Sequence, residues 1–319
     1  MLVLQVLPDE EGLRPDRLLR RRYPQVDRPK ALALLKGGRV LVDGERARLA
    51  TVVRAGQRVE VEVSLVEAGR PADVREPTVL YLDSGVCVLD KPAGMAMHGG
   101  TGVGADEPTL HGWVRSHLDV EAGLSGPSFL GRLDRLTSGL VIAALSRAGL
   151  EAVGPAWSRG AFEKAYLTLV HGRVDGAGVI DVPLVARRER HRGKGRVEVA
   201  ITHFASLASS RAASLLLVFP ETGRTHQIRR HMKAVGHPVV GDPRHGDPRR
   251  DRALGVETRG EGAAGLMLHA YRYRHSDEGI GLPSAIRAAV PERMRRMADA
   301  LGLGIEEAER VAEEVSLSE

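Results

Sequence analysis

Hydrophobic and polar positions near the start of the chain predict a small domain over residues 12–66. Apolar residues recur at helical spacing around Leu18 and Leu19, and again from Ala31 to Leu35 before a Gly-Gly pair. Two stretches, "RVLVDGERA" and "QRVEVEV", then alternate apolar and polar residues, the first about an Asp-Gly turn. The pattern indicates two helices packed on a short hairpin-like sheet.

The rest of the chain is dominated by short apolar segments that predict strands. After a polar, proline-bearing linker at 67–77 come "VCVLD", "GLVIAALS", "AYLTLVHG" and "SLLLVFP", with few helical patterns between them. Strands in clusters favour an α+β fold with a mixed, largely antiparallel sheet over a doubly wound fold. We assign 78–283 to this domain and 284–319 to a C-terminal helical tail.

Composition narrows the class of protein. Of the 319 residues 43% are apolar but only 3% are aromatic, so aliphatic packing must dominate the core. Cys87 is the only cysteine, which excludes an intrachain disulfide and a cysteine-based zinc site and fits a reducing compartment. The sequence shows neither a signal peptide nor a membrane-spanning run. We therefore expect a cytoplasmic protein that binds no membrane.

Positive charge is clustered along the chain. Residues 14–58 contain thirteen Lys or Arg against four Asp or Glu, and 186–196 contain six against one. Residues 304–319 have the opposite balance, with six acids and one arginine. Clustered cations predict a polyanionic partner, most often nucleic acid. In the small domain, the residues expected to face outward toward RNA are Arg20, Arg21, Arg28 and Lys30.

One carboxylate is a candidate for chemistry. In "FLGRLDRLTSGLVIAALS", Asp134 lies between Arg132 and Arg135, directly before an apolar strand. Two arginines within hydrogen-bonding range would lower the pKa of this carboxyl group and keep it ionised. A nucleophile or a fixed charge needs that state, whereas a general acid does not. On spacing alone, a solvated Arg-Asp-Arg surface triplet is the alternative.

A second segment, "ETGRTHQIRRHMKAVGHPVVGD" at 221–242, predicts an amphipathic helix. Thr225 or Thr222 can cap its start, and Gly236 can end it. At helical spacing one side carries His226, Arg229, Arg230 and Lys233, and the other carries Ile228, Met232 and Val235. The pattern predicts a buried aliphatic stripe and an outward cationic face. The histidines of this segment lack the H-E-x-x-H spacing, so no zinc site is expected.

Both segments resemble the signature sequences of RluA-type pseudouridine synthases. "GRLDRLTSGL" and "TGRTHQIRRHMKAVGHPVVGD" match the two principal signatures, and "VLDKPAGMAMHGG" and "FEKAYLTLVHG" match two more in the expected order. The match runs from Val88 to Asp242, and the N-terminal pattern resembles the S4 RNA-binding domain. The resemblance implies that the chain isomerises uridine in RNA, exchanging a C–N for a C–C glycosidic bond through an essential aspartate.

The resemblance also assigns roles to residues. Asp134 matches the essential aspartate, Tyr166 the active-site tyrosine, and Arg229 the basic residue that pairs with the aspartate. Arg132 matches an arginine that enters the RNA when the uridine is turned out. Tyr166 is expected to stack on the uracil and to act as a base near the sugar. Arg135 is expected to do something else.

Other positions of the matched segments complete this assignment. Arg224 and His226 are assigned to RNA binding. Gly131 departs from the family, which usually has histidine there, and this change is expected to loosen the turn before Arg132.

The implied partner is RNA. The S4-like domain favours large-subunit ribosomal RNA, and tRNA is the alternative substrate. A non-catalytic RNA-binding assembly factor with the synthase fold is the alternative from another class. Because isomerisation is redox-neutral, we expect no metal and no small-molecule cofactor. A monomer is the default expectation.

Overall fold

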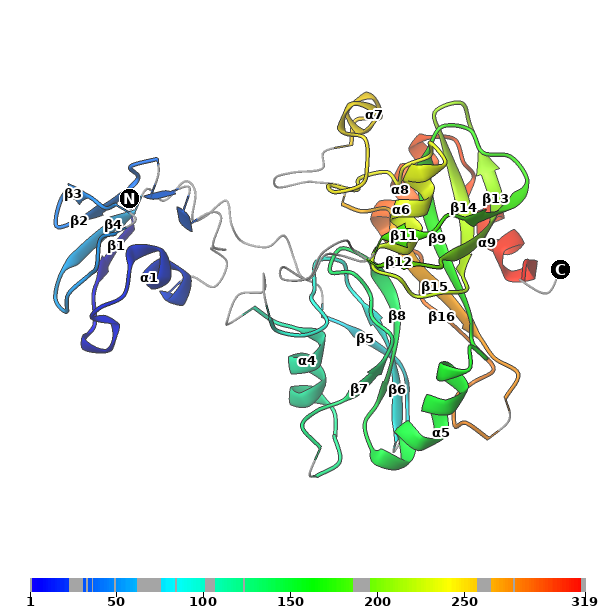
Figure 1. The fold of residues 1–319 in the computed structure, drawn as a ribbon, viewed down its shortest axis with the longest axis horizontal. Helices are drawn as coiled ribbons and strands as arrows, with labels where there is room; N and C mark the ends of the chain where they lie inside the picture. Colours follow the sequence, from blue (N-terminus) through cyan, green and yellow to red (C-terminus); the bar gives the residue numbers. More distant parts are fainter. Residues whose placement is uncertain are drawn as a thin grey trace. The chain divides into compact units, whose positions relative to one another are not determined.

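The computed structural model divides the chain into two units (Figure 1). The small unit comprises Met1–Val74 with His98–Gly112, and the large unit comprises Arg75–Met97 with Trp113–Glu319. The structure describes residues 2–22, 31–32, 34–35, 37–48, 50–61, 76–83, 85–100, 107–122, 124–185, 196–256, 265–277 and 279–316.

The small unit contains a four-stranded antiparallel sheet and helical segments, where the sequence predicts two helices on a short hairpin-like sheet. Its elements are β1 (Leu2–Gln5), η1 (Pro8–Glu10), α1 (Pro15–Arg22), β2 (Val40–Val42), β3 (Glu45–Arg46) and β4 (Arg58–Val61). The strands lie in the order β1-β4-β2-β3. Asp43 and Gly44 join β2 to β3 with φ of 51° and 83°, the left-handed pair that a type I′ hairpin turn requires. The pattern did not predict β1, which pairs with β4.

Aliphatic side chains fill the core of the small unit. Leu18 and Leu19 of α1 are fully buried and pack in one cluster with Leu34 of the second predicted helix. Residues 31–32 and 34–35 of that helix are described, and they are helical. Arg21 is exposed and Arg20 is partly exposed. Arg28 and Lys30 lie outside the described residues.

A ten-stranded mixed sheet forms the centre of the large unit. Its strands are β5 (Thr78–Leu82), β6 (Val86–Lys91), β7 (Ser128–Leu130), β8 (Ser138–Ala144), β9 (Glu163–His171), β10 (Ala177–Asp181), β13 (Ile201–Ser209), β14 (Ala213–Pro220), β15 (Leu268–Arg274) and β16 (Ala285–Arg287). Eight lie in the order β10-β13-β14-β9-β15-β8-β6-β5, while β16 pairs with β15 and β7 with β8. Among these described strands β8 and β15 run parallel, and the other pairs are antiparallel. The predicted α+β class is confirmed.

Helices cover both faces of this sheet (Figure 1). On one face α6 (Gln227–Ala234) packs Ile228 and Met232 against Val170 of β9. On the other, α8 (Glu292–Ala300) and α9 (Ile305–Glu314) pack in one cluster with Leu169. Neighbouring residues of a strand point to opposite faces, which explains the division. Within the expected tail at 284–319, α8 and α9 thus share the core of the sheet.

The remaining described elements are three helices and a pair of short strands. They are α4 (Leu110–His117), α5 (Arg147–Ser158), α7 (Pro248–Ala253) and the paired strands β11 (Leu184–Val185) and β12 (Val197–Glu198). Ser146 caps α5 by accepting a hydrogen bond from the amide of Gly149. The basic stretch predicted to bind RNA joins β11 to β12, and its residues 186–195 lie outside the described residues.

Candidate active site

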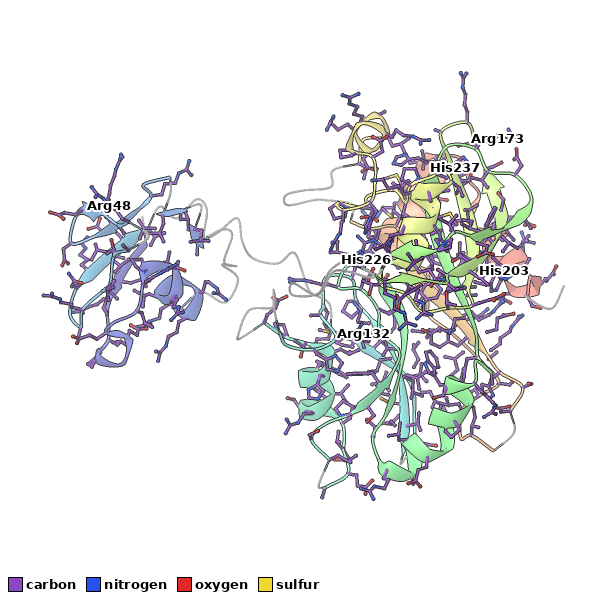
Figure 2. The ribbon with its side chains drawn as sticks, in the orientation of Figure 1. Arg48, Arg132, Arg173, His203, His226 and His237 are labelled. Carbon is purple, nitrogen blue, oxygen red and sulfur yellow. The ribbon has the colours of Figure 1, made fainter. Side chains whose placement is uncertain are left out.

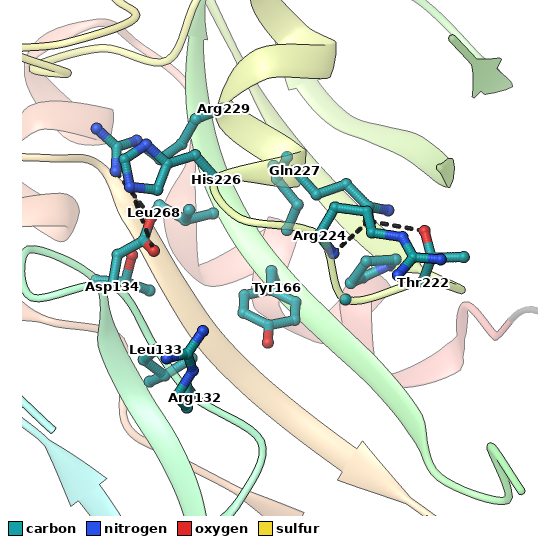
Figure 3. A pocket seen from close by; sticks show the side chains of 14 residues that line it. Arg132, Leu133, Asp134, Tyr166, Thr222, Arg224, His226, Gln227, Arg229 and Leu268 are labelled. Atoms are coloured by element: carbon teal, nitrogen blue, oxygen red, sulfur yellow. Dashed lines mark hydrogen bonds and ion pairs between the residues drawn. The ribbon is translucent and has the colours of Figure 1, made fainter. Parts of the chain in front are cut away.

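A pocket of about 110 Å³ opens in the large unit, beside the loop before β8, the middle of β9 and the start of α6 (Figure 3). All six candidate residues that the sequence places in this unit line it: Asp134, Tyr166, Arg229, Arg132, Arg224 and His226. In the view of Figure 3, Tyr166 lies between Asp134 with Arg229 on one side and Arg224 on the other. The fold therefore gathers segments that are far apart in sequence.

The loop before β8 presents Asp134 to this pocket. Asp134 accepts a hydrogen bond from Arg229 Nη1 at 2.8 Å. The neighbour Arg135 is turned away, because its Nε donates to the carbonyl of Gly94 at 2.9 Å. The expectation that Arg132 and Arg135 together hold Asp134 is thus replaced by an ion pair with Arg229. That Arg135 has a different task stays a prediction.

Arg229 points into the protein, so its predicted place on an outward cationic face is wrong. Only 4% of the residue is exposed, whereas Lys233 on the same helix is exposed. Arg229 Nε and Nη2 each donate to Asp242 at 2.7 Å, while Nη1 reaches Asp134. Two carboxylates offset the cost of burying the guanidinium, which helical periodicity alone does not reveal. Val235, predicted on the apolar side, is 43% exposed.

Asp242 was not predicted as a site residue, although it ends the quoted segment. Its side chain is fully buried. Beyond the two bonds from Arg229, its Oδ1 accepts the amides of Arg244 and His245 at 2.9 Å each. Burial alone raises the pKa of this carboxyl group, but the hydrogen bonds from Arg229 and the two amides outweigh it, and the pKa lies below its ordinary value. Asp242 thereby fixes Arg229.

The start of α6 differs from the expectation. The N-cap is His226 with φ of 55°, and neither Thr222 nor Thr225 takes that position. Thr222 instead donates its hydroxyl to Gln227 Oε1 at 2.7 Å, and that atom also accepts the amide of Arg224. These bonds hold the turn that precedes the helix. The predicted helix end is close to the observed one, since the C-cap is Val235.

His226 pairs with a second histidine next to the aspartate. Its Nδ1 lies 2.8 Å from Nε2 of His245, and its Nε2 lies 3.7 Å from Oδ1 of Asp134. Burial lowers the pKa of His226 against the opposing effect of Asp134. Burial lowers the pKa of His245 to about 4. Both imidazoles are therefore neutral at neutral pH.

Tyr166 comes from the middle of β9. Its neighbours in the apolar cluster include Ile228 and Leu268, which also line the pocket. Burial raises the pKa of the phenol to about 12, with Asp134 adding to the effect. The pocket thus offers an aromatic ring and aliphatic walls beside an ion pair, which suits a flat, uncharged ring with polar edges.

Lys91 ties the loop of Asp134 to the turn after β6. The lysine is fully buried. Its ammonium donates to the carbonyls of Pro92 at 2.8 Å, Met95 at 2.9 Å and Arg135 at 3.2 Å. Burial, aided by Arg293, lowers the pKa of Lys91 to about 7. The resemblance placed this residue in a signature segment but gave it no role.

The two arginines assigned to RNA lie differently in the pocket. Arg132 is exposed where it lines the pocket (Figure 2). Arg224 is partly buried, and its Nε donates to the carbonyl of Val199 at 3.0 Å. Arg132 is thus the more accessible to a ligand.

The described part of the chain contains neither a cluster of metal ligands nor a membrane-spanning helix. No three His, Cys, Asp or Glu side chains within it are grouped as a metal ion would need. None of its helices is both long and apolar enough to cross a membrane.

Comparisons with known proteins place the chain among RNA-modifying enzymes. A family model described as RNA pseudouridylate synthase matches residues 85–234. The ribosomal large subunit pseudouridine synthase D of Xanthomonas campestris is 33% identical over 307 residues, covering 93% of this chain and 91% of the relative. The chain belongs to the RNA pseudouridine synthase family. The predicted resemblance to the RluA type is confirmed, as is the prediction of an RNA pseudouridine synthase.

Other pseudouridine synthases match over similar lengths. The ribosomal large subunit pseudouridine synthase C of Escherichia coli K12 is 29% identical over 311 residues, covering 92% of this chain and 94% of the relative. The structure of human RNA pseudouridylate synthase domain containing 1 superposes with a TM-score of 0.56 and 21% identity, covering 77% of this chain and 98% of that one. At that identity the structural match shows a shared fold.

The structure explains one departure of this pseudouridine synthase from its family. Gly131 has φ of 86°, and a Cβ atom there would lie 2.7 Å from Cζ2 of Trp157. A histidine side chain at this position would therefore meet the indole ring. Trp157 fills the space beside the turn that leads to Asp134, so the turn is packed rather than open.

Proposed function

We propose that this pseudouridine synthase modifies uridines of large-subunit ribosomal RNA, with Asp134, Tyr166 and Arg229 at its active site. The observation that carries the proposal is the ion pair of Asp134 with Arg229, 2.8 Å long, in a pocket that Tyr166 also lines. The choice of ribosomal RNA is supported by relatives named for the large ribosomal subunit, matched over 93% and 92% of this chain.

The proposed reaction begins when the target uridine leaves its stack, at a cost of a few kcal/mol. Arg132, exposed at the pocket, fills the space that the base vacates. The carboxylate of Asp134 then bonds transiently to C6 of the uracil or C1′ of the ribose. The N1–C1′ bond breaks and C5 bonds to C1′. C5 loses its proton, N1 gains one, and the aspartate is released unchanged.

Tyr166 is proposed to stack on the uracil and to form a hydrogen bond with the nucleotide. Burial raises the pKa of its phenol to about 12, so the group keeps its proton at neutral pH. A protonated phenol is a poor base. We therefore assign Tyr166 stacking and hydrogen bonding in place of the base role that the family resemblance implied.

Arg229 and Arg224 are proposed to have different roles in the pocket. Arg229, fixed by Asp242, orients Asp134 and stabilises its negative charge. Arg224 and His226 are proposed to contact the RNA backbone at the rim. We expect the enzyme to act as a monomer in the cytoplasm, with no metal or cofactor.

The small unit is proposed to be an S4-like RNA-binding domain. Its α1 ends with three successive arginines, Arg20, Arg21 and Arg22. Arg22 donates to the buried Glu10 at 2.5 Å, which anchors the end of the helix to the core of the unit. Arg21 is exposed and Arg20 partly so, a placement that suits phosphate contacts. Arg28 and Lys30 belong to the same proposal.

Release of tritium from C5 tests this function. Large-subunit ribosomal RNA and tRNA are transcribed in vitro with uridine labelled at C5, so that no site is modified beforehand. We expect release from ribosomal RNA and none from tRNA. Release from tRNA alone would show that the substrate is tRNA, the alternative to ribosomal RNA. No release from either RNA, with RNA binding intact, would contradict the catalytic assignment in favour of an RNA-binding factor.

A further inference from the structure

His226 adopts a backbone conformation that is rare for a residue with a side chain. Its φ of 55° and ψ of 32° lie in the left-handed region, where Asp43 of the hairpin turn is the other non-glycine residue with positive φ in the described part of the chain. An N-cap side chain commonly bonds a helix amide, but that of His226 makes no such bond to α6. Residues held in this region cluster at functional sites. The conformation therefore points to a role for this side chain outside the helix.

The carboxylate of Asp134 presents a different oxygen to each of two neighbours (Figure 3). Oδ2 accepts the hydrogen bond from Nη1 of Arg229 at 2.8 Å. Oδ1 faces Nε2 of His226 at 3.7 Å, a separation too long for a hydrogen bond but short enough for a strong electrostatic effect. Because Arg229 engages Oδ2, Oδ1 is the oxygen better placed to bond to the nucleotide. The ring of His226 thus lies beside the oxygen proposed to react.

These neighbours decide which nitrogen of His226 carries the proton. A carboxylate only accepts, so an N–H at Nε2 is attracted to Oδ1 of Asp134, whereas a lone pair there would be repelled. Burial lowers the pKa of the imidazole, which is therefore neutral at neutral pH and has a single N–H. With that proton on Nε2, Nδ1 of His226 can only accept a hydrogen bond.

His245 supplies the donor that this nitrogen needs. Nε2 of His245 lies 2.8 Å from Nδ1 of His226, and the two rings meet edge-on, with centroids 5.1 Å apart and an interplanar angle of 81°. Two ring nitrogens at that distance share one proton, and Nδ1 of His226 has none to give. Nε2 of His245 therefore donates. This bond fixes both the tautomer and the orientation of His226.

The position of His245 is itself fixed. Its amide donates to Oδ1 of Asp242 at 2.9 Å, and the same carboxylate holds Arg229. The side chain of His245 is half-buried. This residue lies beyond the signature segment that ends at Asp242, so the family resemblance gave it no role. One buried carboxylate thus anchors both neighbours of Asp134, Arg229 directly and His226 through His245.

We propose that His245 is a positioning residue for the isomerisation, which donates a hydrogen bond to Nδ1 of His226 and thereby directs the Nε2–H of His226 at Oδ1 of Asp134. The inference rests on the proposed role of Asp134 as the nucleophile. The N–H of His226 stabilises the negative charge that returns to Oδ1 when its bond to the nucleotide breaks, while Arg229 serves Oδ2. The two histidines exchange no proton with the nucleotide. The same N–H is the donor that His226 would offer to an oxygen of the RNA.

The first measurement is the tautomer of His226 in the full-length protein. Histidine is labelled with the heavy nitrogen isotope, the ring nitrogens are observed by NMR at neutral pH, and His226→Gln assigns the signals of His226. We expect the wild-type proton on Nε2. His245→Leu removes the donor and should reduce the fraction of this tautomer, whereas His245→Gln, whose amide can donate in its place, should retain it.

Tritium release and RNA binding then connect the tautomer with turnover. We expect His245→Leu to lower kcat by about 10-fold or more, with KM and Kd within about twofold of wild type, because an oriented donor beside developing charge is lost. His245→Gln should recover kcat to within about threefold of wild type. His275→Leu is the control, since this half-buried histidine bonds the carbonyl of Pro283 at 2.9 Å and does not line the pocket. Thermal unfolding checks that each variant folds.

The outcomes separate this inference from the proposed function. A proton on Nδ1 of wild-type His226 would overturn the inference directly, whichever RNA the enzyme modifies. Turnover of His245→Leu close to wild type would also overturn it, as would equal losses in folded His245→Leu and His245→Gln, which a packing role explains. If Asp134→Asn keeps its turnover, the proposed nucleophile fails, and the role of His245 in the reaction fails with it.

Discussion

Asp242 holds Arg229 with both of its carboxylate oxygens, and the remaining terminal nitrogen of the guanidinium bonds Asp134 at 2.8 Å. Asp242→Asn removes the charge from this buried pair. We expect a loss of about 3–5 kcal/mol in the free energy of unfolding, because the change leaves a buried cation poorly compensated. Urea denaturation measures it. Asp175→Asn, which alters an exposed ion pair with Arg173, is the control and should cost less than about 1 kcal/mol.

The same pair predicts a dependence on pH. The folded pKa of Asp242 is lower than that of an unfolded aspartate, about 3.9. The unfolded chain therefore binds the proton first as pH falls, and stability is lost as pH drops through the folded pKa. The stability difference between wild type and Asp242→Asn should be constant above about pH 5 and shrink below about pH 4. A difference that persists unchanged at acidic pH would contradict this account.

Lys91 predicts a second rise of stability with pH, in a window at higher pH. Its folded pKa is about 7, whereas an unfolded lysine has a pKa of about 10.4. Between these values the unfolded chain binds more protons, so stability rises with pH. Relative to Lys91→Met, wild type should gain about 2 kcal/mol in the free energy of unfolding from pH 7 to pH 9. Lys233→Met controls for loss of charge at an exposed lysine. Parallel profiles for wild type and Lys91→Met would refute the prediction.

Much of this fold was predictable because several of its strands appear in the sequence as apolar runs. The strands β8 and β14 are apolar except for one serine each, Ser138 and Ser214, and every residue of β8 is buried. A strand that is buried on both faces is a continuous apolar run, so it can be predicted without knowing which of its side chains lie on which face. β1 has only four residues, a run too short for its pattern to distinguish a strand from a helical turn. The large sheet was thus foreseen and the first strand of the small one was not.

The site was predictable as a set of residues but not in its geometry. Periodicity placed Arg229 outward because a buried guanidinium is costly, and only Asp242, thirteen residues away, reverses that cost. This error arises because a partner supplied by another segment leaves no trace in the local pattern of the helix.

The packing of Trp157 over Gly131 predicts that the family histidine is not tolerated here. Gly131→His should cost more than Gly160→His, since Gly160 also has positive φ but has nothing within 4 Å of an added Cβ. We expect an excess loss of about 1–3 kcal/mol from the clash with the indole. Combining Gly131→His with Trp157→Leu should relieve part of it. Urea unfolding of wild type, Gly131→His, Trp157→Leu and the double variant measures the coupling energy between the two positions. If the two single effects add within about 0.5 kcal/mol, the predicted contact is contradicted.

The small unit predicts a contribution to RNA affinity that depends on salt. The double variant Arg20→Ala/Arg21→Ala should bind ribosomal RNA more weakly and reduce the slope of log K against log salt by about 1–2, because each phosphate contact releases about one counterion. Arg58→Ala is the control, since this arginine lies on β4 and pairs with Glu60 at 3.2 Å. An unchanged slope in the double variant would contradict the claim that α1 contacts the RNA.

The most direct test of the account is the comparison of wild type with Asp134→Asn in release of tritium from C5 of ribosomal RNA, with RNA affinity measured in parallel. The substitution keeps the shape of the side chain that Arg229 contacts and removes its charge. We expect release to fall below detection while Kd stays within a few-fold, because the nucleophile is lost and the RNA surface is kept. Turnover close to wild type in Asp134→Asn would contradict the central claim that this carboxylate performs the chemistry.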